Sequence, residues 1–265
     1  MNARSESPAE AADATPVPRR VLVWDAPVRV FHWLMVLSFA GAYVTAESER
    51  FRLLHVTLGY TLAGLVVFRL LWGLAGTRHA RFSDFVRGPA AIWRYLRNLV
   101  AGRAEHHVGH NPAGALAIVL LLGLSLAVTA SGFVLYNQLS GEWMEEVHEA
   151  AANIMLALVL VHVAGVAVSS WLHRENLVGA MITGRKIARP EDGIRSAWRS
   201  VAAMMLVAVL GFWWLQWQAA PAAGEMAQQA AQGEAHAAAG GTARAARHER
   251  HERHQRSSRH DGNDD

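Results

Sequence analysis

The sequence predicts an all-α membrane protein, a bundle of four transmembrane helices followed by a fifth. Three observations support this fold class. Five apolar stretches are each long enough to cross a bilayer, basic residues gather in alternate loops, and histidines lie inside the apolar stretches. The predicted spans are residues 28–46, 53–75, 113–136, 148–172 and 200–217.

The loop charges predict the orientation of these spans. Six arginines lie between the second and third spans, and a second basic loop joins the fourth span to the fifth. The intervening loops carry acidic residues, such as Glu142 and Glu145. Since Lys and Arg gather on the cytoplasmic side, we expect a multi-pass protein of the bacterial inner membrane with a cytoplasmic N-terminus and a periplasmic C-terminus.

Two histidines occupy the fourth span, His148 at its start and His162 in its middle. Their spacing of 14 residues is close to four helical turns, which puts both imidazoles near one face of the helix, about 21 Å apart along its axis. Neutral imidazole is a common ligand of metals and of haem iron. The chain has no cysteine, so a haem bound here is b-type and held without covalent attachment.

Two further histidines match these two depths. His32 lies near the cytoplasmic start of the first span, and His55 near the periplasmic start of the second. A single intramembrane histidine is more often a packed polar residue or a proton relay than a haem ligand. Four histidines at two matched depths instead predict two b-type haems, held by His55 with His148 and by His32 with His162.

The histidines between the second and third spans are expected to face solvent or lipid headgroups. They lie in an arginine-rich loop and are His79, His106, His107 and His110. The same region, residues 78–110, has an aromatic and aliphatic face among arginines, which predicts an amphipathic helix on the cytoplasmic surface.

Other residues are candidates for contact with the haems. Arg69 follows His55 by 14 residues and is predicted to pair with a haem propionate, as is Arg29, although both side chains are long enough to snorkel to the headgroups instead. Gly59, one turn after His55, gives room for the macrocycle or for a neighbouring helix. Glycines also recur every nine residues in the third span, at Gly114, Gly123 and Gly132.

An ordered set of motifs resembles the bacterial cytochrome b561 and nickel–iron hydrogenase b-type cytochrome superfamily. The motifs are VRVFHW at 28–33, LHVTLGY at 54–60, FRLLWG at 68–73, GHNPAG at 109–114, VHEAAANIMLALVLVHV at 147–163 and HRENLVGAMITGRK at 173–186. The resemblance implies a four-helix di-haem core, with His32, His55, His148 and His162 as axial iron ligands. It also implies quinone chemistry coupled to an electron-transfer partner.

The chain is accordingly divided into four parts. Residues 1–20 lack the apolar centre of a secretory signal and are expected to form a disordered cytoplasmic leader, the alternative being that residues 28–46 act as a signal peptide. Residues 21–190 form the di-haem core and residues 191–217 the fifth span. The His- and Arg-rich residues 218–265 are expected to be a disordered periplasmic tail.

The predicted function is electron transfer between the quinone pool and a periplasmic partner, either a c-type cytochrome or a hydrogenase small subunit. The lipid bilayer is the expected surroundings, and no nucleic-acid partner is expected, because the arginines serve as a topology signal. Two alternatives stay open. One is a superoxide oxidase that passes electrons from superoxide to quinone, and the other is a haem-free anchor or transporter that uses the histidines as proton relays.

Overall fold

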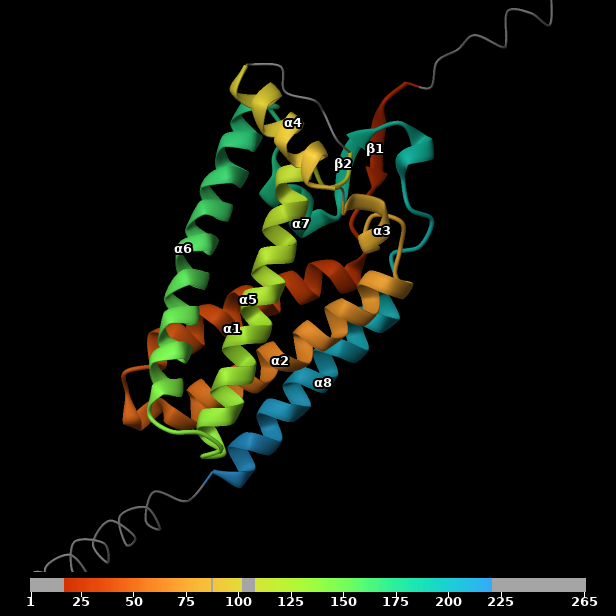
Figure 1. Ribbon diagram of the computed structural model, residues 1–265. Coiled ribbons are helices and arrows are strands. Elements are labelled where there is room, and N and C mark those ends of the chain that lie inside the picture. Colours follow the sequence, from red (N-terminus) through yellow and green to blue (C-terminus); the bar gives the residue numbers. More distant parts are fainter. Residues whose placement is uncertain (1–16, 87, 102–107, 221–265) are drawn as a thin grey trace, which may run out of the picture. The chain divides into compact units, whose positions relative to one another are not determined.

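The computed structural model describes residues 17–86, 88–101 and 108–220. The chain divides into two compact units, residues 1–214 and 215–265, and the second is described only at residues 215–220. In the described part, five helices are long and apolar enough to cross a membrane: α1 (Ala26–Thr45), α2 (Arg52–Ala75), α5 (Pro112–Tyr136), α6 (Trp143–Leu172) and α8 (Arg199–Ala219). Each matches a predicted span, so the fold class is confirmed (Figure 1).

Two of these helices begin with a short polar capping residue and a proline in the first turn. Asp25 precedes α1, and its carboxylate accepts a hydrogen bond from the Val28 amide. Asn111 precedes α5 and accepts one from the Gly114 amide. Such caps satisfy amides that have no partner within the helix, and a proline in the first turn loses no helical hydrogen bond.

Four helices share one apolar core. Phe39 of α1, Leu62 of α2, Val128 of α5 and Met155 of α6 form one buried cluster in which each helix is represented. The outward side of α6, by contrast, exposes large apolar side chains, among them Leu160, Val161, Val163 and Val168. Lipid is the solvent that such a surface requires, which agrees with a multi-pass membrane protein.

The fifth long helix packs against the first two. Met205 of α8 is buried together with Phe31, Leu34 and Leu65. The Trp213 indole N–H donates a hydrogen bond of 2.9 Å to the Thr61 hydroxyl on α2. The fifth span is therefore fastened to the bundle by both apolar packing and a polar contact.

A small cap covers the end of the bundle where α1 begins and α6 ends (Figure 1). It contains β1 (Arg19–Leu22), α3 (Phe82–Phe85), α7 (Leu177–Thr183), β2 (Arg185–Ala188) and the 3-10 helix η2 (Pro190–Asp192). The strands β1 and β2 pair antiparallel, with Arg19 opposite Ala188. The sequence did not predict this sheet, because four-residue strands are too short to produce a clear alternating pattern.

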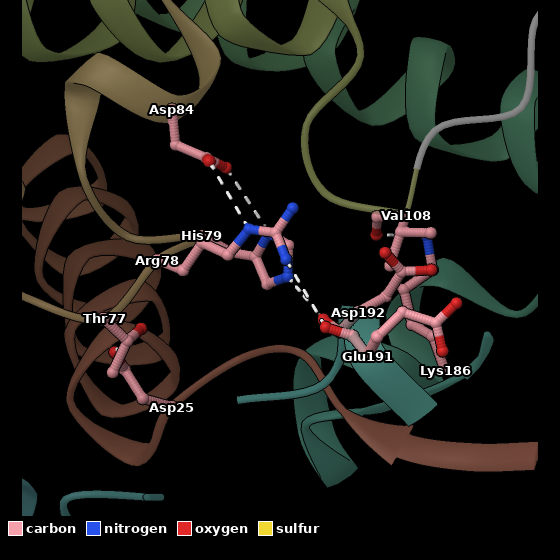
Figure 2. Close-up of polar contacts among 9 residues, drawn as sticks. All are labelled: Asp25, Thr77, Arg78, His79, Asp84, Val108, Lys186, Glu191 and Asp192. Carbon is pink, nitrogen blue, oxygen red and sulfur yellow. Dashed lines mark hydrogen bonds and ion pairs between the residues drawn. The ribbon is translucent and has the colours of Figure 1, made fainter. Parts of the chain in front are cut away.

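A buried carboxylate joins the cap to the bundle. Asp25 is 1% exposed and, besides capping α1, accepts hydrogen bonds from the Trp72 indole at 3.1 Å and the Thr77 hydroxyl at 2.6 Å. Figure 2 shows Thr77 directly above Asp25. Three donors thus satisfy one buried acid and connect the start of α1 to the end of α2.

The loop between α2 and α5 contains α3 and α4 (Pro89–Val100), where the sequence predicted one amphipathic surface segment over residues 78–110. The short 3-10 helix η1 (Glu49–Phe51) connects α1 to α2 at the other end of the bundle. The predicted leader lies outside the described residues up to residue 16, and β1 begins at Arg19, within the range assigned to the leader. The predicted tail lies outside them from residue 221 onward.

Candidate functional site

His55 of α2 and His148 of α6 lie together at the end of the bundle opposite the cap. Their ring centroids are 6.3 Å apart, and the planes of the rings differ by 74°. The two residues are 93 positions apart in the sequence, so only the packing of the helices brings their imidazoles together.

The hydrogen bond made by His55 determines which of its nitrogens is free. Its Nδ1 lies 2.8 Å from the Ala42 carbonyl oxygen on α1. A carbonyl can only accept a hydrogen bond, so Nδ1 carries the proton and donates it. The Nε2 atom of the neutral ring then has a lone pair available for a metal.

His148 is held in the same way by a serine. Its Nδ1 lies 3.0 Å from the Ser131 hydroxyl on α5. That hydroxyl also lies 2.8 Å from the Ala127 carbonyl oxygen and 3.1 Å from that of Val128, and its single proton is donated there. Ser131 therefore accepts the hydrogen bond from His148, and the Nε2 of His148 is again left as a lone pair.

This geometry fits two axial ligands of one iron. A bond from a metal to an imidazole nitrogen is about 2.0–2.1 Å long, which puts two imidazole centroids on opposite sides of one ion roughly 6.3 Å apart. Ligating histidines typically donate their other N–H to a carbonyl or a similar acceptor, as both do here. The His55–His148 pair thus has the spacing and the tautomers that a bis-histidine haem requires.

Two glycines border this pair. A Cβ on Gly132 of α5 would lie 3.0 Å from the Cε1 atom of His148, so a larger residue here would require the imidazole to shift. A Cβ on Gly59 of α2 would meet nothing within 4 Å, which leaves open space one turn from His55. The predicted macrocycle contact of Gly59 is compatible with that space and stays a prediction.

The other two predicted ligands lie nearer the cap. His32 of α1 and His162 of α6 are close enough to interact electrostatically. The Nδ1 of His32 is buried, and no hydrogen-bond partner for it is found in the part of the chain that the structure describes. A buried imidazole nitrogen without a partner is costly, and a haem bound at this level would give the ring a role that offsets the cost.

Both arginines that were predicted to pair with a haem propionate donate hydrogen bonds to backbone carbonyl oxygens. Arg69 is 3% exposed, donates from Nη1 to the Ala80 carbonyl oxygen at 3.0 Å and lies over the rings of Phe82 and Phe85. Arg29 donates from Nη1 to the Ile182 carbonyl oxygen at 2.6 Å. A guanidinium has five N–H donors, so a propionate contact by either residue remains a prediction.

The expectation that His79 faces solvent or headgroups was wrong. His79 is 5% exposed, and the Nδ1 atom of His110 is also buried. The cap buries His79 and the Nδ1 of His110, and no sequence pattern indicated the cap because its strands are so short. His106 and His107 lie outside the described residues.

Sequence reasoning also missed the partners that orient the ligands. Ser131 was not singled out because a serine in a membrane helix commonly bonds only to its own backbone. The Ala42 carbonyl carries no side-chain signal at all. Elsewhere in the described residues, no group of three or more His, Asp, Glu or Cys is placed to hold a bare metal ion. Paired imidazoles suit an iron whose remaining ligands come from a macrocycle.

Comparison with known proteins identifies the family of the chain. The sequence model of a family described as prokaryotic cytochrome b561 matches residues 23–184. A probable Ni/Fe-hydrogenase B-type cytochrome subunit of Rhizobium leguminosarum bv. viciae is 23% identical over 217 residues, which cover 65% of this chain and 91% of the relative.

Two other relatives carry similar names. A probable Ni/Fe-hydrogenase B-type cytochrome subunit of Cupriavidus necator is 25% identical, covering 61% of this chain and 85% of the relative. A probable Ni/Fe-hydrogenase 1 B-type cytochrome subunit of Escherichia coli K12 is 28% identical, covering 44% of this chain and 60% of the relative. No solved structure matches significantly.

Proposed function

This chain belongs to the prokaryotic cytochrome b561 family and is a multi-pass membrane cytochrome that binds b-type haem, and we propose that it carries electrons between a periplasmic hydrogenase and the membrane quinone pool. The observation that carries the proposal is the pair His55 and His148, whose rings have the separation and tautomers of bis-histidine iron ligands.

The proposed stoichiometry is two haems. His55 and His148 hold one, and His32 and His162 hold the other. A bound haem would supply one-electron redox chemistry, and ligation of each iron by two histidines would favour electron transfer over oxygen binding. The buried Phe39, Leu62, Val128 and Met155 draw on all four helices and exclude water from the bundle interior.

The proposed orientation follows from charge. The end with the cap is rich in arginine, in particular Arg19, Arg20, Arg78, Arg81, Arg185 and Arg189. Such residues favour the cytoplasmic side. His55 and His148 then lie near the periplasm, where Glu142 precedes α6 and Glu145 and Glu146 lie in its first turn.

The proposed partner rests on the names of the relatives. Those described above are hydrogenase cytochrome subunits, which supports a hydrogenase rather than the c-type cytochrome that the sequence left open. The same names favour this function over the superoxide oxidase and over the haem-free anchor.

Two measurements test the function. Haem content per chain, with a reduced-minus-oxidised spectrum, is expected to give two b-type haems. In membranes that contain the hydrogenase, hydrogen gas is expected to reduce the haems, and an added quinone to reoxidise them. Haems that stay oxidised under hydrogen, although dithionite reduces them, would rule out the hydrogenase as electron donor.

A further inference from the structure

The cap encloses a cluster of titratable side chains that haem binding leaves unexplained. Asp84 lies on α3 with its side chain 32% exposed, whereas His79 is 5% exposed. The Nδ1 of His79 is 3.4 Å from a carboxylate oxygen of Asp84. Figure 2 shows Asp84 and Asp192 on opposite sides of the His79 ring.

The hydrogen bond between His79 and Asp192 determines which nitrogen of His79 faces Asp84. The Nε2 atom lies 2.8 Å from the backbone carbonyl oxygen of Asp192, which can only accept, so Nε2 carries a proton. Nδ1 then faces the carboxylate either as a bare lone pair or as an N–H. Nδ1 has no hydrogen-bond partner among the described residues, and the Asp84 carboxylate, 3.4 Å away, is placed to exchange a proton with it.

His110 continues this cluster inward. Its ring packs between Trp24, at a centroid distance of 4.5 Å, and Phe85, at 4.6 Å. Trp24 also contacts His79 at 6.3 Å, and a Cβ on Gly109, the residue before His110, would lie 3.1 Å from the Nδ1 of His79. The Nδ1 of His110 is buried, and the described residues offer it no hydrogen-bond partner.

Electrostatics keeps His110 neutral at rest. Burial lowers the pKa of His110 to about 3, and the groups that face it add to the effect: Arg69, His79, Lys186 and His162. Lys186 itself pairs with Glu175 at 3.1 Å and donates to the Val108 carbonyl oxygen. A proton that reaches His110 therefore does not rest there. Through His162, the inner end of the cluster also lies near the proposed haem site at this end of the bundle.

We infer that Asp84, His79 and His110 carry protons through the cap, from the protein surface toward the haem site of His162, for the reduction of quinone. This inference rests on the proposed function. Each quinone reduced to quinol takes up two electrons, which enter from the periplasmic hydrogenase through the haems, and two protons from the cytoplasmic water.

The proton moves from Asp84 to His79 and then to His110. The O–H bond of protonated Asp84 breaks as an N–H bond forms at Nδ1 of His79. That N–H bond breaks in turn as the proton passes to His110, whose ring shares the neighbour Trp24 with His79, and His110 then releases it toward the quinone. Asp84 is reprotonated from water, since its side chain is the exposed member of the three.

The test compares variants that remove one proton carrier with a variant that does not. Asp84→Asn, His79→Gln and His110→Gln each interrupt the path. Asp192→Asn is the matched control, because His79 bonds to the backbone oxygen of Asp192 and not to its side chain. The full-length haem-loaded protein is reduced and mixed with decylubiquinone, and haem reoxidation is followed by absorbance.

Each path variant is expected to slow reoxidation at least about tenfold, which is less than the roughly 10²- to 10⁴-fold that a positioned proton carrier typically contributes. Haem content, spectrum and midpoint potentials should match the wild type, which separates lost proton transfer from lost structure. Asp84→Glu and Asp192→Asn should keep the wild-type rate, and a small weak acid such as formate should restore the rate of Asp84→Asn. A pH-indicator dye should record proton uptake slowed in step with reoxidation.

Two results would overturn the inference in distinguishable ways. Wild-type rates in both Asp84→Asn and His79→Gln, with wild-type haem that quinone reoxidises, remove the proton path and leave the proposed function standing. Wild-type haem that decylubiquinone does not reoxidise removes the quinone function and the path together. Because Asp84 is partly exposed, its variant remains a valid test even if His110→Gln fails to fold.

Discussion

The Nδ1 atom of His148 lies 3.0 Å from the hydroxyl oxygen of Ser131, whose own proton is donated to the backbone of α5. This relationship makes the serine an acceptor, fixes the tautomer of the imidazole and leaves Nε2 free for iron. Ser131 lies on α5, which carries no predicted iron ligand, and it orients His148 on the neighbouring helix α6.

Removing this hydroxyl should weaken haem binding without abolishing it. We expect Ser131→Ala to reduce the affinity for the haem on that side about 10–100-fold, the usual effect of losing a partner that orients a metal ligand. Haem titration into the apoprotein measures it. Ser125→Ala is the control, because that hydroxyl contacts Leu121 of its own helix and Met155 but no histidine. Equal affinity in Ser131→Ala and Ser125→Ala would contradict the role of Ser131.

Each proposed ligand pair should hold one haem independently. We expect His148→Ala to lose the haem shared with His55, and His162→Ala to lose the one shared with His32, so that each variant binds one haem instead of two. Pyridine haemochrome assay of the purified chain gives the count. His173→Ala, which changes a histidine just beyond the end of α6, should keep both. A full haem complement in His148→Ala would refute the assignment.

The close approach of Gly132 to His148 should be sensitive to side-chain size. A Cβ there would lie 3.0 Å from the imidazole, so Gly132→Val is expected to push the ring out of line and reduce occupancy of that haem. Gly123→Val on the same helix is the matched control, since a Cβ at Gly123 meets nothing within 4 Å. Absorbance at the haem Soret band, normalised to protein, compares the two. The same occupancy in both variants would show that the ring tolerates the added bulk.

Asp25 should hold the cap on the bundle. Asp25→Ala removes the cap of α1 and leaves the indole N–H of Trp72 and the hydroxyl of Thr77 without an acceptor. We expect this change to cost about 2–4 kcal/mol in the free energy of unfolding, visible as a lower Tm in detergent. Asp192→Ala, which replaces a partly exposed acid, should cost much less. A wild-type Tm in Asp25→Ala would show that the cap is held elsewhere.

Acid should destabilise the cap through His110. Burial lowers the pKa of His110 to about 3 in the folded protein, against about 6.5 in an unfolded chain, so between these values the unfolded state binds more protons. The contribution of His110 to stability is therefore complete above about pH 6.5 and is lost as the pH falls toward 3, with a slope of at most about 1.4 kcal/mol per pH unit.

Thermal unfolding between pH 4.5 and 7.5 measures this dependence. His110→Gln is expected to flatten the profile, since glutamine does not titrate. An equally steep profile in His110→Gln would assign the acid sensitivity to other groups.

The long helices were predictable from the sequence because their signal is local. Twenty consecutive apolar residues leave few structures other than a membrane helix, and loop arginines give its direction. His55 and His148 could be assigned to one depth from these two facts alone.

The cap could not be predicted because it depends on contacts between distant parts of the sequence. Its strands are four residues long, and the pairing of Arg19 with Ala188 joins positions far apart in the chain. His79 and His110 therefore looked like residues of an exposed polar loop, whereas the folded cap buries the His79 ring and the Nδ1 of His110.

By itself, the sequence determined the number of membrane helices, the position of His32, His55, His148 and His162 along their helices and the absence of thiol ligands, because these depend on composition and on the regular rise of a helix. Only the tertiary structure decided that Ala42 and Ser131 orient His55 and His148, and that His79 meets Asp84. Those contacts join different segments of the chain, and the distance between two side chains on separate segments is set by packing.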